Sequence, residues 1–431
     1  MKRVPPSEKT RDRIRNLLLE GSPNDPLSEL IRLSVQHIVE ESLEGAVRDA
    51  LGRGYYERDG ESTGYRNGYR TGSVKTSEGK VTFASPQVRG EVDVEGLRGL
   101  RELVKGRSEE LERLAVEMYA RGCSTRDIEA MFRGEDGRSL ISRSAVSEIT
   151  EVMWADYEEF VSRDLSEIRV LYLFLDGIAE KLRPGARREA VLCAWAVTEE
   201  GRKVLIHLAP GTKESTDCCR EFIQDLQRRG LRDPVLVVTD GAAGLIRAVE
   251  ECFPASLRGR CLAHKMRNLM SKVPEALMTE FREASRAAYQ APSPAMARVL
   301  RQDLVDRFGK ECPTAVRCFE EDFEACIAHL NCPPGHRRFI RSTNLLERLF
   351  VEERRRLRAA GTMFGERSVL KLMYSAIIRA SDTWHGIKVS EFERTQLKHL
   401  QQQLKDQLRK ETRPVTKPGS ATKEIYSTSR T

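Results

Sequence analysis

The sequence IRVLYLFLDG, residues 168–177, decides the fold class of this 431-residue chain. Its apolar run has the length of a strand and is typical of one that is buried on both faces. Two similar runs follow, EAVLCAWAV at 189–197 and KVLIHLAPG at 203–211, with turn-rich links between them. Consecutive strands of this kind predict one part of a β-sheet.

Helices and strands alternate after the third run. Residues 214–230 are expected to form a helix, and PVLVVTDG (234–241) a buried strand. A second helix is expected at 242–253, and a last strand at LRGRCLAH (257–264). Alternation of this kind is typical of β-α-β units, whose strands are parallel. The sequence therefore predicts a mixed sheet with parallel β-α-β units at one edge.

The C-terminal part of the chain is expected to be helical. Residues 265–337 carry no strand pattern, and prolines interrupt the helices expected there. Long helical patterns follow at 341–358 and 367–384. From about Phe392, a helix rich in Gln, Lys and Arg is expected to run into a disordered tail.

Upstream of the sheet, the first segments suggest an arm, a helix and a strand pair. Residues 1–26 are polar, basic and contain prolines, so we expect a mobile arm. Residues 27–52 place apolar side chains on one helical face, which predicts an amphipathic helix packed on its own domain or on a partner subunit. A Gly-, Tyr- and Arg-rich stretch then leads to a short strand pair at 80–94, with a turn near residues 86–90.

Three helical segments precede the first strand of the sheet. Residues 108–122 and 124–134 predict two short helices joined by a tight turn, and 141–161 predicts a third helix after a Ser-rich entry. This order is typical of a helix-turn-helix, which places a recognition helix in the DNA major groove. Small helical bundles share the pattern, so these segments alone favour DNA binding and a purely structural role about equally.

Composition narrows the classes of protein. The chain has 72 Lys and Arg against 65 Asp and Glu, a net charge of +7, and its basic residues cluster at both ends and around 337–358. No apolar run approaches the ~20 residues of a membrane span, and no signal-peptide pattern begins the chain. We therefore expect a soluble cytoplasmic protein whose cysteines are mostly reduced.

Two aspartates end strands of the predicted sheet. Asp176 ends the first strand and Asp240 the fourth, each directly before a glycine. A turn or a helix cap explains either one alone, but ligand sites gather at the carboxyl ends of strands in α/β sheets. Two close carboxylates repel unless a cation joins them, and all-oxygen ligands suit Mg²⁺ or Mn²⁺ rather than Zn²⁺. Glu347, in STNLLERLF, is the best candidate for a third ligand; the alternative is an ordinary solvated helix face.

Four stretches carry a family resemblance: LFLDGI, VVTDGAAGLIRAVEECFP, RCLAHKMRNL and RSTNLLERLFVEERRR, in this order. They resemble the prokaryotic Mutator-type (MULE-like) insertion-sequence transposases, and the resemblance runs from about residue 60 to residue 386. It implies an RNase H-like catalytic core with a DDE triad on Asp176, Asp240 and Glu347, which would hold Mg²⁺ or, in its place, Mn²⁺. It also implies that residues 265–337 are a helical insertion.

The expected fold class is α/β: an RNase H-like mixed-sheet catalytic core with an all-α insertion domain, preceded by an α-helical, helix-turn-helix-like DNA-binding domain. The expected parts are a disordered basic arm (1–26), an N-terminal helix with a Gly/Tyr/Arg-rich DNA-binding or dimerisation region (27–105), the helix-turn-helix-like domain (106–163), the first part of the core (164–264), the insertion (265–337), the C-terminal core helices with Glu347 (338–391), and a C-terminal helix with a disordered basic tail (392–431).

The expected function is that of a DDE transposase, which binds terminal inverted repeats and catalyses metal-dependent DNA strand cleavage and strand transfer. Its expected partners are double-stranded DNA, as transposon ends and as target, and further copies of the chain in a homodimer or larger synaptic complex, with 27–52 as a candidate interface. No membrane or small-molecule partner is expected. Two alternatives stay open: a catalytically inactive helix-turn-helix regulator derived from a transposase, and an RNase H-like structure-selective nuclease.

Further residues are expected to contact DNA or support the site. The candidate DNA contacts are Arg126 and Arg143 in the helix-turn-helix-like domain, and Arg348, Arg355 and Arg356 on the helix of Glu347. Cys261 and His264 match the family's C-x-x-H and are expected near the active site, in a structural role or in contact with DNA. Two residues depart from the family pattern, Cys219 in place of a Trp and Phe350 in place of an Asn.

Overall fold

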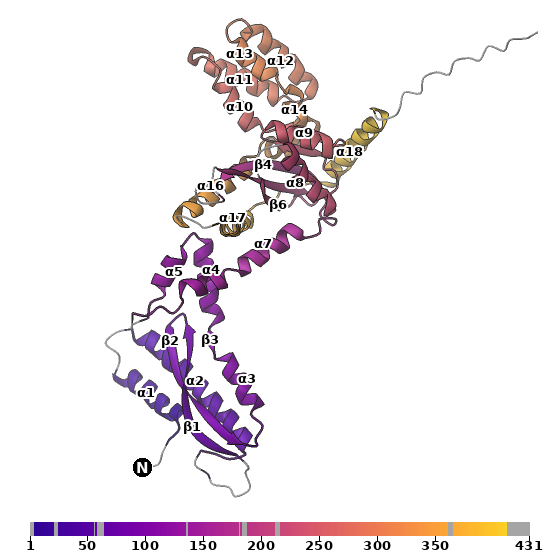
Figure 1. Cartoon of the computed structure of the whole chain (residues 1–431). Helices are drawn as coiled ribbons and strands as arrows, with labels where there is room; N and C mark the ends of the chain where they lie inside the picture. The colour runs from indigo at the N-terminus through magenta and orange to yellow at the C-terminus, as the bar shows by residue number, and fades with distance from the viewer. Residues whose placement is uncertain are drawn as a thin grey trace, which may run out of the picture. The chain divides into compact units, whose positions relative to one another are not determined.

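The computed structural model describes residues 4–20, 25–55, 57, 64–134, 137–180, 182, 188–211, 216–360 and 365–411. These residues divide into two compact units (Figure 1). Unit 1 comprises Met1–Tyr157 with Arg354–Ala376, and unit 2 comprises Glu158–Glu353 with Ile377–Thr431. Among the described helices, none is both long enough and apolar enough to cross a membrane.

Unit 1 begins with two helices that pack against each other, α1 (Pro6–Glu20) and α2 (Pro26–Leu51). Helix α2 confirms the helix predicted at 27–52, although Leu27, Ile31 and Ile38 of its apolar residues are exposed. Helix α1 differs from the mobile arm predicted for this part of the chain. One of its contacts with α2 is a buried hydrogen bond, in which the Thr10 hydroxyl donates to the Glu40 carboxylate at 2.7 Å. This contact joins residues 30 positions apart, so the local sequence does not indicate it.

A sheet in the order β2-β1-β3 follows, formed by β1 (Gly64–Thr76), β2 (Gly79–Gly90) and β3 (Gly106–Arg107), with helix α3 (Glu95–Leu103) between the last two strands. The strand pair predicted at 80–94 is wrong, because β2 is one strand whose antiparallel partner is the Gly/Tyr/Arg-rich stretch. Pro86 suggested a turn. It lies instead on an outer strand beside a register shift of β1, where a missing N–H is tolerated.

Four helices complete the N-terminal part of the chain: α4 (Glu109–Ala120), α5 (Thr125–Met131), α6 (Arg143–Ile149) and α7 (Val152–Ser162). Ser124 and Asp127 form a capping box at α5, as the Ser-led entry predicts. The single helix predicted at 141–161 is two helices, α6 and α7. Thr150 ends α6, and its buried hydroxyl accepts a hydrogen bond from Lys371 of α17 (Glu366–Ser381) at 3.2 Å. This long-range contact has no signal in the local sequence.

Unit 2 is built on a sheet in the order β6-β5-β4-β7-β8. Its strands are β4 (Val170–Glu180), β5 (Glu189–Thr198), β6 (Lys203–Gly211), β7 (Leu236–Thr239) and β8 (Leu257–Arg260). The first three strands pair antiparallel, whereas β7 and β8 run parallel to β4. The mixed sheet with parallel β-α-β units at one edge is therefore confirmed. The last strand is shorter than predicted, because helix α10 (Leu262–Met270) begins two residues after Arg260.

Both faces of this sheet are covered, as its continuous apolar strands predict. Helices α8 (Thr216–Arg228) and α9 (Ala243–Cys252) pack on one face, where Phe222 and Leu245 join the buried side chains of β4. On the other face, the rings of Phe174 and Trp195 stack with centroids 3.9 Å apart. The C-terminal helix of the unit is α18 (Glu391–Glu411); the tail predicted to be disordered lies outside the described residues.

A helical insertion separates β8 from the next core helix, α16 (Asn344–Ala360), as predicted for residues 265–337 (Figure 1). After α10 it contains α11 (Met278–Tyr289), α12 (Pro294–Phe308), α13 (Pro313–Glu320), α14 (Phe323–Ile327) and α15 (Pro334–Ile340). These helices bury a core of their own around Phe281, Phe308 and Phe319. The cysteines of the insertion are buried free thiols, in agreement with the expectation of reduced cysteines, and this core contains Cys312, Cys318 and Cys326.

Candidate active site

Asp176 and Asp240 lie side by side at one edge of the unit 2 sheet. Parallel pairing of β4 with β7 matches Leu175 with Thr239, so the next residue on each strand is one of the two aspartates. The following strand continues the row, because the Cys261 N–H donates to the Thr239 carbonyl at 2.8 Å. The expectation that Asp176 ends its strand is wrong, because β4 continues to Glu180 through its antiparallel pairing with β5. Asp240 and Cys261 do directly follow the ends of β7 and β8. The parallel register places Asp176 beside these two strand ends, so both predicted carboxylates and the C-x-x-H cysteine share one region of the sheet.

The Asp176 carboxyl group is strongly perturbed. Its side chain is 4% exposed, and burial raises its pKa to about 7, with a further contribution from the nearby Asp240 carboxylate. His264 and Thr343 act in the opposite direction, by charge and by hydrogen bonding respectively. A buried carboxyl beside a second carboxylate is costly to ionise, and an added cation would relieve that cost.

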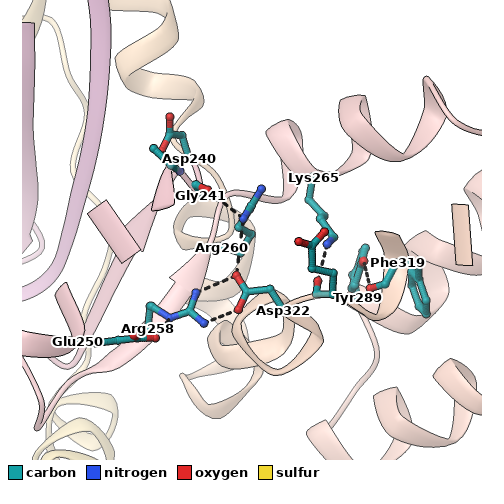
Figure 2. Close-up of polar contacts among 11 residues, drawn as sticks. Asp240, Gly241, Glu250, Arg258, Arg260, Lys265, Tyr289, Phe319 and Asp322 are labelled. Carbon is teal, nitrogen blue, oxygen red and sulfur yellow. Dashed lines mark hydrogen bonds and ion pairs between the residues drawn. The ribbon is translucent and has the colours of Figure 1, made fainter. Parts of the chain in front are cut away.

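Asp240 is held by the turn that follows it. Its Oδ1 accepts a hydrogen bond from the Ala242 N–H at 2.9 Å, so the turn explanation is correct for this residue, whereas the cap explanation is wrong because Ala242 is the N-cap of α9. The next residue, Gly241, has a φ of +94°, and a Cβ there would lie 1.8 Å from the guanidinium carbon of Arg260. Figure 2 shows Arg260 against this turn. Gly241 therefore allows both the turn after Asp240 and the close approach of the Arg260 guanidinium to the backbone.

Arg260 belongs to an ion-pair network that the sequence analysis missed (Figure 2). It donates to the Gly241 carbonyl at 3.3 Å and lies 3.7 Å from Asp322, in the loop before α14. Arg258 donates to both Asp322 oxygens and pairs with Glu250 of α9 at 2.9 Å. The network links β8 to the insertion beside Asp240. Arginines on alternate residues of LRGR were the available signal, because charged side chains are uncommon in a strand.

Cys261 and Thr343 connect the sheet edge to the start of α16. The backbone N–H and the hydroxyl of Thr343 both lie 3.3 Å from the Cys261 sulfur, and both residues are buried. Burial alone would raise the pKa of Cys261, but the hydrogen bonds of His264 and Thr343 outweigh it and the pKa is lowered. These contacts fix where the chain enters the helix that carries Glu347. Thr343 is a second residue that the sequence analysis did not identify.

Glu347 is oriented by two basic side chains of α10. Its Oε1 lies 3.2 Å from His264 Nε2 and 3.3 Å from an Arg267 amino group. The His264 pKa is raised to about 9, mainly by the Cys261 sulfur and further by Asp176 and Glu347. Both Asp176 and Glu347 act on the charge of the His264 ring, so the C-x-x-H belongs to the same site as these two carboxylates.

The two aspartates offer oxygen ligands that suit a divalent cation, whereas Glu347 is paired with basic side chains in this structure. Asp176 and Asp240 supply adjacent carboxylate oxygens, and burial and repulsion already disfavour their joint ionisation. Glu347, however, is engaged by His264 and Arg267. Within the described residues, no three His, Cys, Asp or Glu side chains already stand in a metal-binding arrangement.

The structure places the predicted DNA-contact arginines as follows. In unit 1, Arg126 is exposed near the start of α5, and Arg143 is exposed at the start of α6, where it pairs with Glu129 at 3.1 Å. On α16, Arg348 and Arg355 are exposed and Arg356 is half-buried. The two departures from the family pattern, Cys219 and Phe350, are both buried, so neither reaches the protein surface to contact DNA.

Comparison with known proteins identifies the family of this chain. The family described as "Transposase, Mutator family" matches residues 13–386, and the chain therefore belongs to this family. It is 29% identical over 374 residues to the transposase for insertion sequence element ISRM5 of Rhizobium meliloti (strain 1021), which covers 86% of this chain and 91% of the relative.

Two further relatives are similar over most of their length. The transposase for insertion sequence element IS1201 of Lactobacillus helveticus is 30% identical over 75% of this chain and 87% of its own. The transposase for insertion sequence element IS256 in transposon Tn4001 of Staphylococcus aureus is 27% identical over 85% and 93%, respectively. The family match at residues 13–386 includes parts of both units.

Proposed function

We propose that this transposase cuts a DNA strand at the end of its own element and joins the 3′-OH to another phosphodiester, with Asp176, Asp240 and Glu347 as a DDE triad. The observation that carries the proposal is the register of β4 and β7, which brings Asp176, within β4, beside Asp240 at the end of β7. The raised Asp176 pKa supports it, because perturbed carboxyls cluster at functional sites.

The proposed fold of the catalytic unit is RNase H-like. Three antiparallel strands followed by two parallel strands, in the order β6-β5-β4-β7-β8, support this assignment. The crossover helices α8 and α9 cover one face, and Glu347 of α16 contacts His264 of α10, which directly follows β8. This contact supports a common location for the two aspartates and the glutamate, although Asp176 and Glu347 lie 171 positions apart in the sequence.

Asp176, Asp240 and Glu347 would hold Mg²⁺, or Mn²⁺ in its place. Bound there, divalent ions would activate the attacking water or hydroxyl and stabilise the leaving oxygen. The chain's own residues prepare the site. His264 and Arg267 keep the Glu347 carboxylate beside α10, and Arg260 fixes the turn that holds Asp240.

The helices α4, α5 and α6 are proposed to bind the terminal inverted repeats as a helix-turn-helix-like domain. They share one core, to which Leu111, Ile128 and Val146 contribute. Arg126 and Arg143 are exposed near the N-termini of α5 and α6, and recognition helices contact bases with their N-terminal residues. Two element ends must be joined in one reaction, so a dimer or larger complex is proposed, with α2 as a candidate interface.

The test is strand cleavage and joining on a labelled duplex that carries the element's own end, in Mg²⁺ and in Mn²⁺. Wild type is compared with Asp176→Asn, Asp240→Asn and Glu347→Gln, with Glu221→Gln on the exposed side of α8 as the matched control. We expect all variants to bind the duplex, and only wild type and the control to cut and join it.

Other results would assign the protein differently. An active Glu347→Gln would remove this residue from the triad. End binding without cleavage by wild type would favour the inactive regulator. Cleavage of branched or hybrid substrates with no preference for the inverted repeat would favour the structure-selective nuclease.

A further inference from the structure

Beside the candidate active site, unit 2 contains a cavity of about 250 Å³ that the proposed chemistry does not use. Its walls come from three places: the first turns of α10, the end of α11, and the chain that enters α16. We call it the α10–α16 cavity. Two of its elements also position the catalytic glutamate, because Ala263 and Met266 line the cavity while His264 and Arg267 of the same helix contact Glu347.

One side of the cavity is basic. Arg286 and Arg341 line it, and among the described lining residues there is no carboxylate. Gln290 orients Arg341, because its side-chain oxygen accepts a hydrogen bond from the Arg341 guanidinium at 2.5 Å. Asn344, the first residue of α16, adds an amide side chain and the positive end of a 17-residue helix. Planar guanidinium groups beside a helix N-terminus suit a phosphate.

The other side is apolar and rigid. Leu262 and Met266 line it together with Tyr289, which is 1% exposed. The Tyr289 hydroxyl donates to the Phe319 carbonyl at 3.0 Å, so its ring is fixed by the core of the insertion (Figure 2). A flat heterocyclic ring can pack against such a wall and under a guanidinium plane. The volume admits one such ring with its phosphate and excludes a duplex.

We propose that the α10–α16 cavity holds one unpaired nucleotide, extruded from the DNA end next to the cleaved bond. This inference rests on the proposed function for its substrate, and it adds a site for a nucleotide outside the duplex. Arg286 and Arg341 bind the phosphate of that nucleotide, and Leu262 and Met266 contact its base. Because Asn344 precedes Glu347 by one turn of α16, a strand held in the cavity continues toward the catalytic carboxylates.

The experiment follows base extrusion directly. The probe is a duplex carrying the element's end, with 2-aminopurine as successive terminal bases of the cut strand, since its fluorescence rises when a base leaves the stack. Full-length wild type is mixed with it in EDTA, so no cleavage is needed. We expect a fluorescence rise at one position. Arg286→Ala and Arg341→Ala should lower the extruded fraction on the order of fivefold or more, the range of one lost stacking or phosphate contact.

Arg282→Ala is the matched control, because Arg282 lies on α11 one turn before Arg286 and does not line the cavity. It should leave the signal unchanged. Thermal melting of each variant reports on folding, and fluorescence anisotropy of an end-labelled duplex reports on binding. If both cavity variants melt and bind like wild type but lose the rise, the cavity holds the base. If they keep the rise, the proposal is wrong.

The result separates this inference from the proposed function. If wild type never cuts DNA but gives a fluorescence rise that Arg286→Ala loses, the result would support the nucleotide site in the cavity and overturn the triad. Cleavage by wild type without any rise would do the reverse. Excess deoxyadenosine monophosphate tests the source of the nucleotide: it should not reverse the rise, because a tethered nucleotide has the higher effective concentration. Reversal by the free nucleotide would overturn the assignment to DNA.

Discussion

Replacing Asp176 with Asn should stabilise the protein above neutral pH. The pKa of this buried carboxyl is raised to about 7 from the ordinary aspartate value of 3.8, which applies in the unfolded chain. Below pH 3.8 it is neutral in both the folded and unfolded states. Between these two values only the unfolded state ionises, so the free energy of unfolding falls as pH rises, by about 1.4 kcal/mol per pH unit. Above pH 7 the loss is complete and amounts to at most about 4 kcal/mol.

The asparagine variant lacks this titration. Its free energy of unfolding should match that of wild type near pH 4 and exceed it by about 1–4 kcal/mol at pH 8. Asp240→Asn should give a smaller gain, because the Asp240 charge is the second cause of the raised pKa, after burial. Asp156→Asn on the exposed side of α7 is the control and should change nothing.

The assay is urea unfolding in EDTA at several pH values, followed by tryptophan fluorescence, since Trp195 stacks on Phe174 within the same sheet. A stability difference between Asp176→Asn and wild type that stays constant from pH 4 to pH 8 would refute the reasoning. Repeating the series with Mg²⁺ adds a second check. The cation should stabilise wild type at pH 8 and leave the asparagine variant nearly unaffected.

Three further predictions concern residues other than the aspartates. Gly241→Ala should destabilise the protein by about 2–4 kcal/mol in urea unfolding, through its positive φ and the contact with Arg260, and Arg260→Ala in the same chain should restore part of that loss. His264 contributes stability that is fully present below about pH 6.5 and is lost as pH rises through about 9, so wild type should lose about 1–2 kcal/mol over this interval and His264→Gln should not. In DNA-binding titrations, Arg126→Ala and Arg143→Ala should each reduce the slope of log affinity against log salt by about 1, and a flat slope for wild type would contradict phosphate contacts by these arginines.

The sequence predicted the strands of unit 2 well because their signals are local. Continuous apolar runs marked the strands of a sheet covered on both faces, and Asp240 marked the end of β7. The Asp-Gly pair at Asp176 did not mark the end of β4, because antiparallel pairing with β5 carries that strand on to Glu180. Glu347 was harder to place, because a helical pattern does not say which side of the sheet the helix approaches. The family resemblance supplied that placement, and the contact of Glu347 with His264 agrees with it.

The failures have a common cause in long-range contacts. Nothing in the stretch around Thr343 indicates that its hydroxyl meets a sulfur 82 residues away. The sequence around Arg260 does not indicate its role, because its partners, Gly241 and Asp322, lie in other parts of the chain. Pro86 was interpreted as a turn because local rules place proline there first, while its position on an outer strand depends on the pairing with β1.

The two ends of the insertion meet at the sheet edge. The Leu262 N–H donates to the Arg341 carbonyl at 2.9 Å, next to the contact of Cys261 with Thr343. A segment whose ends are joined in this way can change length at little cost, since doubling a closed loop costs only about 0.6 kcal/mol. The helices beyond this junction can therefore be exchanged for a shorter or longer module, and a chimaera that keeps the junction together with the ion pairs of Asp322 should retain the geometry around Asp240 while acquiring a different surface.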